Sequence, residues 1–164
     1  MKMILVFLVM FIQSSGALAS AEELNKQVVI EFFEKYGKDP SFVGLVHPDV
    51  KWWVPETLSF GKEFQSRQEY FTMLSTVFVG FAEPLELDIK SMVAQGNKVS
   101  VEVESNATHK CGEPEPFHYN NKYHFLITLE NGKFVRVKEY NDTKHLSDLY
   151  SLIQSDSCKT KLQK

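Results

Sequence analysis

The chain has 164 residues, of which 43% are hydrophobic and 24% are charged, and its formal net charge is −3 at pH 7. This mildly acidic balance excludes a strongly basic surface, so nucleic acid and anionic membranes are poor partners. Its aromatic content, which includes 13 phenylalanines, is enough for one domain to build a core of its own.

The first 19 residues have the pattern of a secretory signal peptide. Lys2 precedes the short apolar run "ILVFLVMFI", and Ala17 and Ala19 occupy the two small-residue positions of an A-x-A cleavage site. The apolar run is shorter than the ~20 residues that span a bilayer. We therefore expect cleavage near Ala19 or Ala21. The product would have no membrane attachment and would be extracellular, or periplasmic in a bacterium.

Helical patterns come next. Leu24, Val28, Phe32 and Tyr36 recur every four residues, which predicts an amphipathic helix that stops at Gly37.

Three shorter signals follow this helix. The segment "DPSFVGLVHPD" suggests a short helix closed by Pro48, and Val50–Val54 suggests a short strand. Ser66 and Glu69 form a capping box, which predicts that another helix begins there. The apolar face of that helix would carry Phe71, Leu74, Phe78 and Phe81.

The second half of the chain predicts a sheet. Its expected strands are Leu85–Ala94, Lys98–His109, Phe117–Leu129 and Lys133–Asp142. Asn131 and Gly132 favour a type I′ hairpin turn before the last strand. Helices early and an antiparallel meander late indicate an α+β domain over residues 20–154. We expect N-terminal helices to pack on a curved antiparallel sheet, making a cone with an interior pocket. A polar C-terminal tail, 155–164, would follow.

The inward register of these strands turns from apolar to polar toward one end of the sheet. Such a change is expected where a pocket opens, and several strand ends should converge there. The predicted ligand-binding residues are Trp52, Ser105, Ala107, Asn121 and Phe125.

Glu139 is the most unusual of the inward residues. Val135 and Val137 alternate with charged residues, and continuing that alternation places Glu139 on the apolar side. A carboxyl group among aromatic rings loses hydration, so its pKa rises and it becomes a usable general base. Tyr123, expected opposite Glu139, could donate a hydrogen bond to an oxyanion, and His109 could be a second acid or base.

Each of these three candidates also has a structural interpretation. Glu139 could reach solvent at the strand end or pair with Arg136, His109 could be a surface histidine, and Tyr123 could be a core tyrosine. The histidines lack metal-ligand spacing, so we expect no metal, and nothing in the sequence calls for a cofactor.

Two further patterns concern covalent modification. Cys111 and Cys158 favour one disulfide that ties the C-terminal tail to a loop, since no CxxC or His/Cys cluster accompanies them. Asn106 and Asn141 begin N-glycosylation sequons, which matter only in a eukaryote. Asn106 lies in the solvent register and is the better acceptor.

The series "HPDVKWWVP", "RQEYFTML", "VSVEVES" and "GKFVRVKEYNDTKH" resembles a SnoaL-like domain. That family belongs to the superfamily of nuclear transport factor 2, ketosteroid isomerase and limonene epoxide hydrolase. The resemblance spans about Glu22 to Tyr150 and implies the α+β cone and a deep pocket. It does not fix the activity, because the superfamily includes isomerases, dehydratases, cyclases and non-catalytic binders.

The epoxide hydrolase pattern can be compared residue by residue. It resembles an Arg-x-Asp pair on one strand and an Asp on the last strand. Glu139 matches the last position, but the pair falls at Ser105 and Ala107, which cannot activate water, so this reaction is disfavoured. We expect a secreted pocket protein that binds an apolar small molecule. The alternatives are a cofactor-independent isomerase, dehydratase or cyclase, and a homodimeric interaction module.

Overall fold

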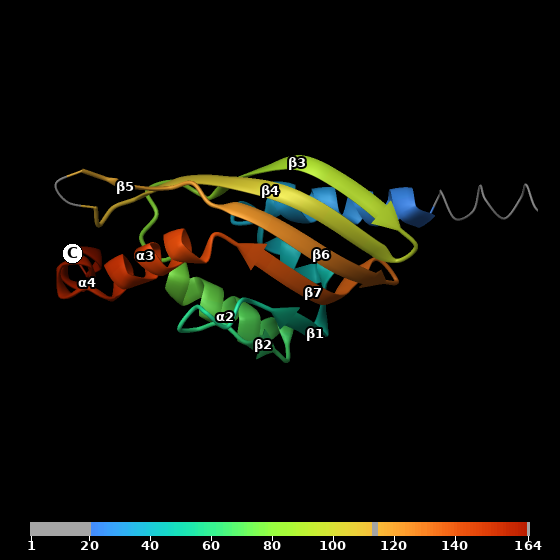
Figure 1. Ribbon diagram of the computed structural model, residues 1–164, viewed down its shortest axis with the longest axis horizontal. Helices are drawn as coiled ribbons and strands as arrows, with labels where there is room; N and C mark the ends of the chain where they lie inside the picture. The colour runs from blue at the N-terminus through green and yellow to red at the C-terminus, as the bar shows by residue number, and fades with distance from the viewer. Residues whose placement is uncertain (1–20, 113–114, 164) are drawn as a thin grey trace, which may run out of the picture.

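The computed structural model describes residues 21–112 and 115–163 (Figure 1). The predicted signal peptide lies outside this range. Within it, no helix is both long enough and apolar enough to cross a membrane.

The helices form largely where the sequence predicts them. A helix covers residues 21–35 and ends before Gly37, whose φ of +70° suits glycine. The Ser66 side chain caps α2 by accepting a hydrogen bond from the Glu69 amide at 3.1 Å, which confirms the predicted start. The remaining bounds are Pro40–Leu45 for the 3₁₀ helix η1, Arg67–Val77 for α2, Thr143–Gln154 for α3 and Asp156–Leu162 for α4.

One curved sheet faces α2 and α3, which lie on the same side of it in Figure 1. The strands are β1 Val46–Trp53, β2 Glu63–Phe64, β3 Glu86–Gln95, β4 Lys98–His109, β5 Phe117–Tyr119, β6 Lys122–Glu130 and β7 Lys133–Asn141. Their order is β2-β1-β7-β6-β4-β3, with β5 paired to β4. The α+β class is therefore confirmed. The β1–β7 pair is parallel, whereas an entirely antiparallel sheet was expected.

The predicted helix end at Pro48 is wrong. Helix η1 ends at Leu45, and β1 begins at Val46 and includes Pro48. The ladder between β1 and β7 is interrupted between Val46 and Lys51, so a residue without an amide hydrogen is tolerated there.

The predicted strand Phe117–Leu129 is divided into β5 and β6. The break falls at Asn121, whose Oδ1 accepts hydrogen bonds from the amides of Lys122 at 2.7 Å and Asp142 at 3.0 Å. These side-chain bonds hold the chain where it turns, and the Asp142 amide also donates to the Lys122 carbonyl at 3.2 Å.

The hairpin between β6 and β7 changes the expected pairing of Glu139. Asn131 and Gly132 have φ values of +50° and +70°, in agreement with the predicted type I′ turn. The register then shifts just after the turn and leaves Val135 without a partner. Phe125 therefore lies opposite Glu139, and the prediction that Tyr123 does so is wrong by two residues. The turn alone would pair Glu139 with His124, and the bulge moves every later pair by one further residue.

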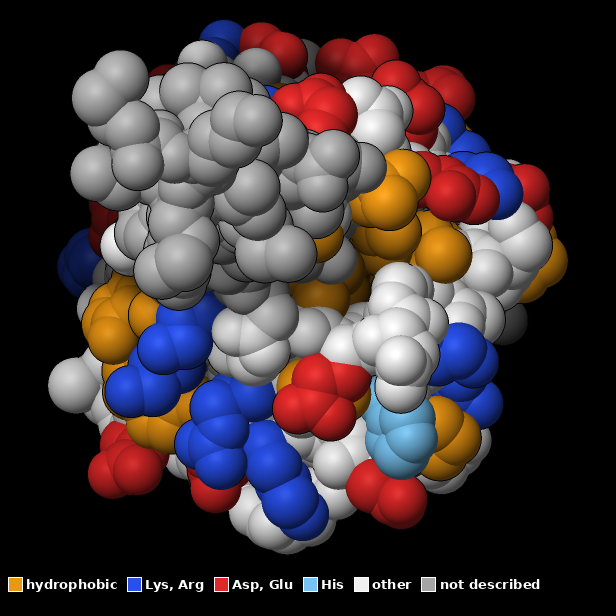
Figure 2. All heavy atoms as spheres, turned by 90° about the vertical axis from the view of Figure 1, so that its right-hand side faces the viewer, with side chains coloured by type: hydrophobic (Ala, Val, Ile, Leu, Met, Phe, Trp, Pro, Cys, Tyr) orange, Lys and Arg blue, Asp and Glu red, His pale blue; other side chains and the backbone are white. Residues whose placement is uncertain are grey.

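The core on the inner face of the sheet combines aliphatic side chains with a cluster of aromatic rings. Phe32 from the first helix lies against Phe134 of β7, with ring centroids 4.8 Å apart. At the other end of the chain, Cys158 of α4 is bonded to Cys111, so residues 156–162 form a docked helix. On the end of the molecule shown in Figure 2, charged side chains of both signs are interspersed.

Candidate functional site

Glu139 lies inside the cone and is only 6% exposed. Its Oε2 accepts two hydrogen bonds, from Trp52 Nε1 and from the Tyr70 hydroxyl, each at 2.9 Å. Its Oε1 accepts a third from Asn141 Nδ2 at 3.2 Å. The carboxyl group is thus buried and held in one orientation.

Three elements place these donors around the acid. The parallel pairing of β1 with β7 sets Trp52 beside Val137, two residues before Glu139. Helix α2 brings Tyr70 against Trp52, and their rings stack at a centroid distance of 3.9 Å. The stack fixes both donors, so the acid meets a rigid pair of N–H and O–H groups.

Burial raises the pKa of Glu139 above its ordinary value, against the opposing effect of the hydrogen bonds from Trp52, Tyr70 and Asn141. Burial, and then the nearby Glu139, raise the pKa of Tyr36 and of Tyr70 well above the usual range. Both tyrosines therefore stay neutral and keep their hydroxyl protons at physiological pH.

A small inner chamber of about 30 Å³ lies beside Glu139. It has room for roughly one or two water-sized groups. Trp52, Tyr70, Tyr123 and Phe125 are among its walls.

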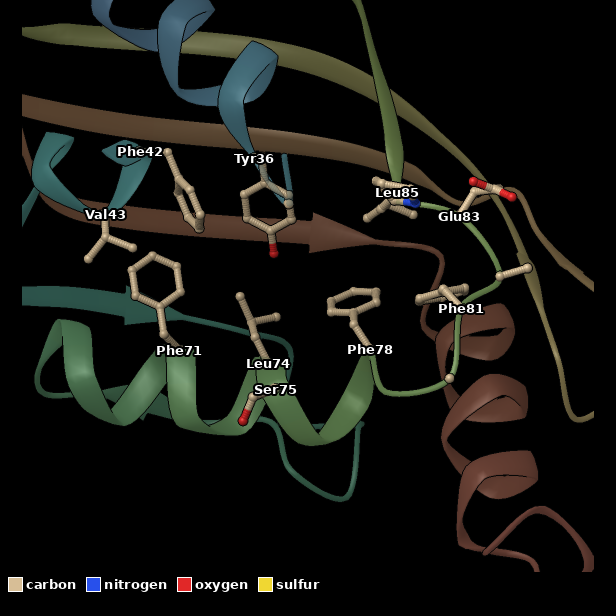
Figure 3. A pocket seen from close by; sticks show the side chains of 14 residues that line it. Tyr36, Phe42, Val43, Phe71, Leu74, Ser75, Phe78, Phe81, Glu83 and Leu85 are labelled. Carbon is tan, nitrogen blue, oxygen red and sulfur yellow. The ribbon is translucent and has the colours of Figure 1, made fainter. Parts of the chain in front are cut away.

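A larger outer chamber of about 540 Å³ adjoins it (Figure 3). This volume is typical of a small-molecule site. Its walls come from helix α2, from η1, and from residues 80–85, which connect α2 to β3. The two chambers share four lining residues, Tyr36, Leu74, Phe78 and Leu85, which form the partition between them.

Tyr36 is a site residue that the sequence reasoning missed. Its hydroxyl points into the space between the first helix and α2 (Figure 3). No residue within the described ranges makes a hydrogen bond with that hydroxyl. The sequence pattern placed Tyr36 on the apolar face of a helix, and a hydroxyl on such a face was the available signal. Tyr70, the partner of Glu139, was also not singled out.

The structure brings together some of the predicted site residues. Trp52, Tyr123, Phe125 and Glu139 line the inner chamber. The lining of neither chamber includes Ser105, Ala107, Asn121 or His109.

Asn121 instead belongs to a polar network deeper in the sheet. The hydroxyls of Tyr119 and Tyr123 are hydrogen-bonded to each other, and Asn121 Nδ2 donates to the Tyr119 hydroxyl at 2.9 Å. The Asn121 amide donates to Ser105 Oγ at 3.0 Å. Each of these polar groups has a protein partner, so the network has a structural explanation.

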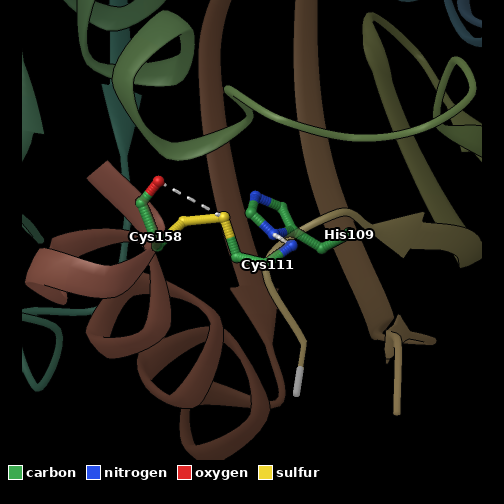
Figure 4. A group of neighbouring side chains, drawn as sticks. All are labelled: His109, Cys111 and Cys158. Carbon is green, nitrogen blue, oxygen red and sulfur yellow. Dashed lines mark hydrogen bonds between the residues drawn. A yellow bond between two sulfur atoms is a disulfide. The ribbon is translucent and has the colours of Figure 1, made fainter. Parts of the chain in front are cut away.

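His109 is fully buried beside the disulfide (Figure 4). Its Nε2 donates to the Val79 carbonyl at 2.7 Å, and its Nδ1 accepts from the Cys111 amide at 3.2 Å. Burial lowers the pKa of this imidazole, although the bond to Val79 opposes the shift. His109 thus clamps the start of the 79–85 segment to β4.

The disulfide also bears on metal binding. The ligand atoms of His109, Cys111 and Cys158 lie within 4.8 Å of one another. The two sulfurs are bonded to each other, as the sequence analysis expected, so neither is a thiolate that could bind a metal.

The two sequons differ in their surroundings. Asn106 is exposed on the outward register of β4. The amide nitrogen of Asn141 is already bonded to Glu139, and its Oδ1 is buried without a hydrogen-bond partner among the described residues. Only Asn106 presents a free amide to solvent.

Fold and site together define an α+β cone protein with an aromatic pocket and a buried acid at its floor. The family model described as a SnoaL-like domain matches residues 29–137, and the chain belongs to that family. No curated protein matches it significantly in sequence.

Several solved structures share the fold. One is a putative SnoaL-like polyketide cyclase from Jannaschia sp. CCS1, with 15% identity, a TM-score of 0.65, and 80% of this chain and 94% of that chain covered. An NTF2-like protein of unknown function from Burkholderia pseudomallei K96243 is 22% identical, with a TM-score of 0.64 and coverages of 80% and 98%. TerC, co-crystallised with polyporic acid, is 17% identical, with a TM-score of 0.64 and coverages of 78% and 98%.

Proposed function

We propose that this protein is a secreted carrier or receptor that binds an apolar small molecule in the outer chamber. The observation that carries the proposal is an aromatic cavity of about 540 Å³ with one unpartnered hydroxyl, that of Tyr36, pointing into it. Apolar walls supply the binding free energy, and a few polar groups orient the ligand.

The comparisons support a small-molecule site. TerC was crystallised with polyporic acid, and the Jannaschia protein is described as a putative polyketide cyclase. Both are less similar to this chain than would carry a ligand across, so the ligand class has to come from the chambers themselves.

Binding without turnover fits the position of Glu139. All three of its hydrogen bonds are made by protein groups, and the chamber beside it holds only about 30 Å³. The bulky body of a substrate in the outer chamber stays beyond Tyr36, Leu74 and Phe78, which line both chambers, so only a small group of the ligand would fit beside the acid. A general base must reach the proton that it removes, either directly or through one water.

A cofactor-independent isomerase, dehydratase or cyclase is the second candidate, and the raised pKa of Glu139 favours it. In this case one water in the inner chamber would relay the proton. If the protein is such an enzyme, Glu139→Gln should abolish turnover and retain ligand binding.

The binding proposal is tested by filling the outer chamber. Leu74→Trp places an indole at the partition, and Leu126→Trp makes the same change on the half-exposed outward register of β6. We expect naphthalenemethanol to bind the wild type and Leu126→Trp equally, and Leu74→Trp at least about 10-fold more weakly, by calorimetry. Equal binding by all three would overturn the proposal.

Tyr36→Phe tests the polar contact separately. Removing one neutral hydrogen bond should weaken naphthalenemethanol binding about 3- to 10-fold while leaving methylnaphthalene unchanged. The methyl compound is the matched control because it cannot hydrogen-bond.

Secretion is supported by the predicted signal sequence and by a disulfide, which persists in oxidising compartments. N-terminal sequencing of protein exported by a eukaryotic host should begin at Ser20, because cleavage after Ala19 leaves helix 21–35 whole. Retention inside the cell with Met1 intact would contradict it.

A further inference from the structure

The charges of the two chambers are all of one sign. Among the lining residues that the structure describes, none is Lys, Arg or His, and the charged ones are Glu139 in the inner chamber and Glu83 in the outer. Nothing on these walls would neutralise an anionic ligand. A carboxylate entering the pocket would lose hydration and meet another carboxyl group.

The remaining walls are suited to the opposite charge. The faces of aromatic rings carry partial negative charge and attract cations, most strongly at tryptophan and tyrosine. Trp52, Tyr70 and Tyr123 border the inner chamber together with Glu139. When an ammonium group leaves water it loses favourable hydration free energy. A carboxyl group surrounded by aromatic rings can offset much of that loss through an ion pair and cation–π contacts.

The sizes of the two chambers agree with a ligand that has a small ammonium head group and a larger apolar body. The inner chamber, about 30 Å³, fits a group the size of an ammonium, and the outer chamber, about 540 Å³, fits an apolar body of two fused rings. Tyr36 stands at the partition, where its hydroxyl can accept a hydrogen bond from the head group.

We infer that the ligand is a small lipophilic amine, bound with its ammonium group in the inner chamber against Glu139 and its apolar body in the outer chamber. This inference rests on the proposed binding function and specifies its ligand. A neutral amine meeting the protonated acid, and an ammonium meeting the carboxylate, give the same bound pair with one shared proton and no net charge. The inner chamber can therefore bind the ligand whether the amine arrives neutral or protonated.

The competing position for the amine is Glu83 at the mouth. Its carboxylate is exposed, so an ion pair there would be weak and screened by salt. Glu139 is buried and held by three donors, and this difference allows the two positions to be separated by experiment.

The test compares three ligands that share one body: naphthalenemethylamine, naphthalenemethanol and naphthoate. With the wild-type protein at pH 7, we expect the amine to bind about 10-fold more tightly than the alcohol, since a charge-assisted hydrogen bond replaces a neutral one. Naphthoate should bind more weakly than the alcohol. Equal affinities of amine and alcohol, or a preference for naphthoate, would overturn the inference and leave the proposed function standing. If no member of the series binds, the proposed function itself fails.

Three carboxyl-to-amide variants then locate the head group. Glu139→Gln should lower the amine affinity about 10-fold and leave the alcohol affinity within about 3-fold. Glu83→Gln, and the matched control Glu86→Gln on the exposed edge of β3, should change neither appreciably. If Glu83→Gln alone removes the preference for the amine, the inner-chamber placement is wrong. The wild-type ranking stands as a test even if Glu139→Gln does not fold.

Discussion

Two buried ionisable residues lie on the inner face of the same sheet and serve different ends. His109 is enclosed by the Val79 carbonyl, the Cys111 amide and the disulfide, and both of its ring nitrogens are bonded to the backbone. Glu139 is bonded to side chains and borders a small cavity. Burial lowers the pKa of His109 and raises the pKa of Glu139, so in both cases it favours the neutral form of the side chain.

The difference shows that a perturbed pKa alone does not mark a site. At His109 the surrounding space is filled by the chain itself, so the histidine acts as a clamp. At Glu139 the free volume is shared with a pocket large enough for a ligand. Open volume beside a held polar group, rather than burial, distinguishes the candidate site.

The largest expected effect concerns the disulfide end. Replacing Cys111 and Cys158 together by Ser should lower the free energy of unfolding by about 4 kcal/mol, because the bridge closes a loop with a sequence separation of 47. Urea denaturation of oxidised protein measures this. The binding free energy of naphthalenemethanol should change much less than the unfolding free energy. If the two free energies fall by equal amounts, the disulfide region and the pocket are not independent.

Tyr70→Phe, beside Glu139, should have the next largest effect on stability. It removes one of the two donors to Glu139 Oε2 and leaves that acceptor poorly satisfied, costing about 2 kcal/mol in unfolding free energy. The loss should be larger at pH 8 than at pH 5, since the ionised acid needs the donor more. A loss that is independent of pH would contradict this role.

The pH dependence of stability separates the two residues by sign. The folded pKa of Glu139 lies above its ordinary value of 4.5, so the native state holds a proton that the unfolded chain releases. Its contribution to stability is therefore complete below about 4.5 and is lost as pH rises to the folded pKa, at about 1.4 kcal/mol per pKa unit. His109, with a pKa lowered from 6.5, destabilises the protein as pH falls below that value.

Glu139→Gln and His109→Gln should each remove one limb of this profile. Urea unfolding at intervals between pH 4 and 9 measures both. If Glu139→Gln keeps the wild-type fall in unfolding free energy on the alkaline side, the burial of a proton on Glu139 does not contribute to stability.

The smallest expected effect is at Gly80, in the segment that His109 clamps. A Cβ there would lie 2.8 Å from His109 Nε2, and the φ of Gly80 is +89°. Gly80→Ala should cost about 1–2 kcal/mol. Gly96→Ala is the matched control, because Gly96 has a φ of +59° and no neighbour within 4 Å. Equal costs would show that crowding against His109 contributes nothing.

Local signals in the sequence predicted much of this fold. The helix start capped by Ser66, the type I′ turn at Asn131 and the inward register of Glu139 all depend on residues close together in the chain, and each is found. The reciprocal bond of the predicted capping box is not made, because Glu69 accepts from the Gln65 amide instead. The inner chamber, by contrast, is formed by residues that are far apart in the chain, so local signals do not predict it. The register of the hairpin, including a bulge at Val135, sets Phe125 opposite Glu139, and no local pattern specifies that β1 pairs in parallel with β7.

The outer chamber was the least predictable feature. The helical spacing of Tyr36, Leu74 and Phe78 predicts residues that pack against a core, because an apolar helical face has the same spacing whether it meets a core or a cavity. Only the distance between the first helix and α2 decides which it meets, and that distance is set by tertiary packing.

The most direct measurement is an NMR titration of leucine-methyl-labelled protein with naphthalenemethanol. We expect saturable 1:1 shifts at Leu74 and Leu85, which line both chambers, and none at Leu126 on the outward register of β6. Shifts at Leu126 with unmoved Leu74 and Leu85 methyls, or no saturable shifts at all, would contradict it.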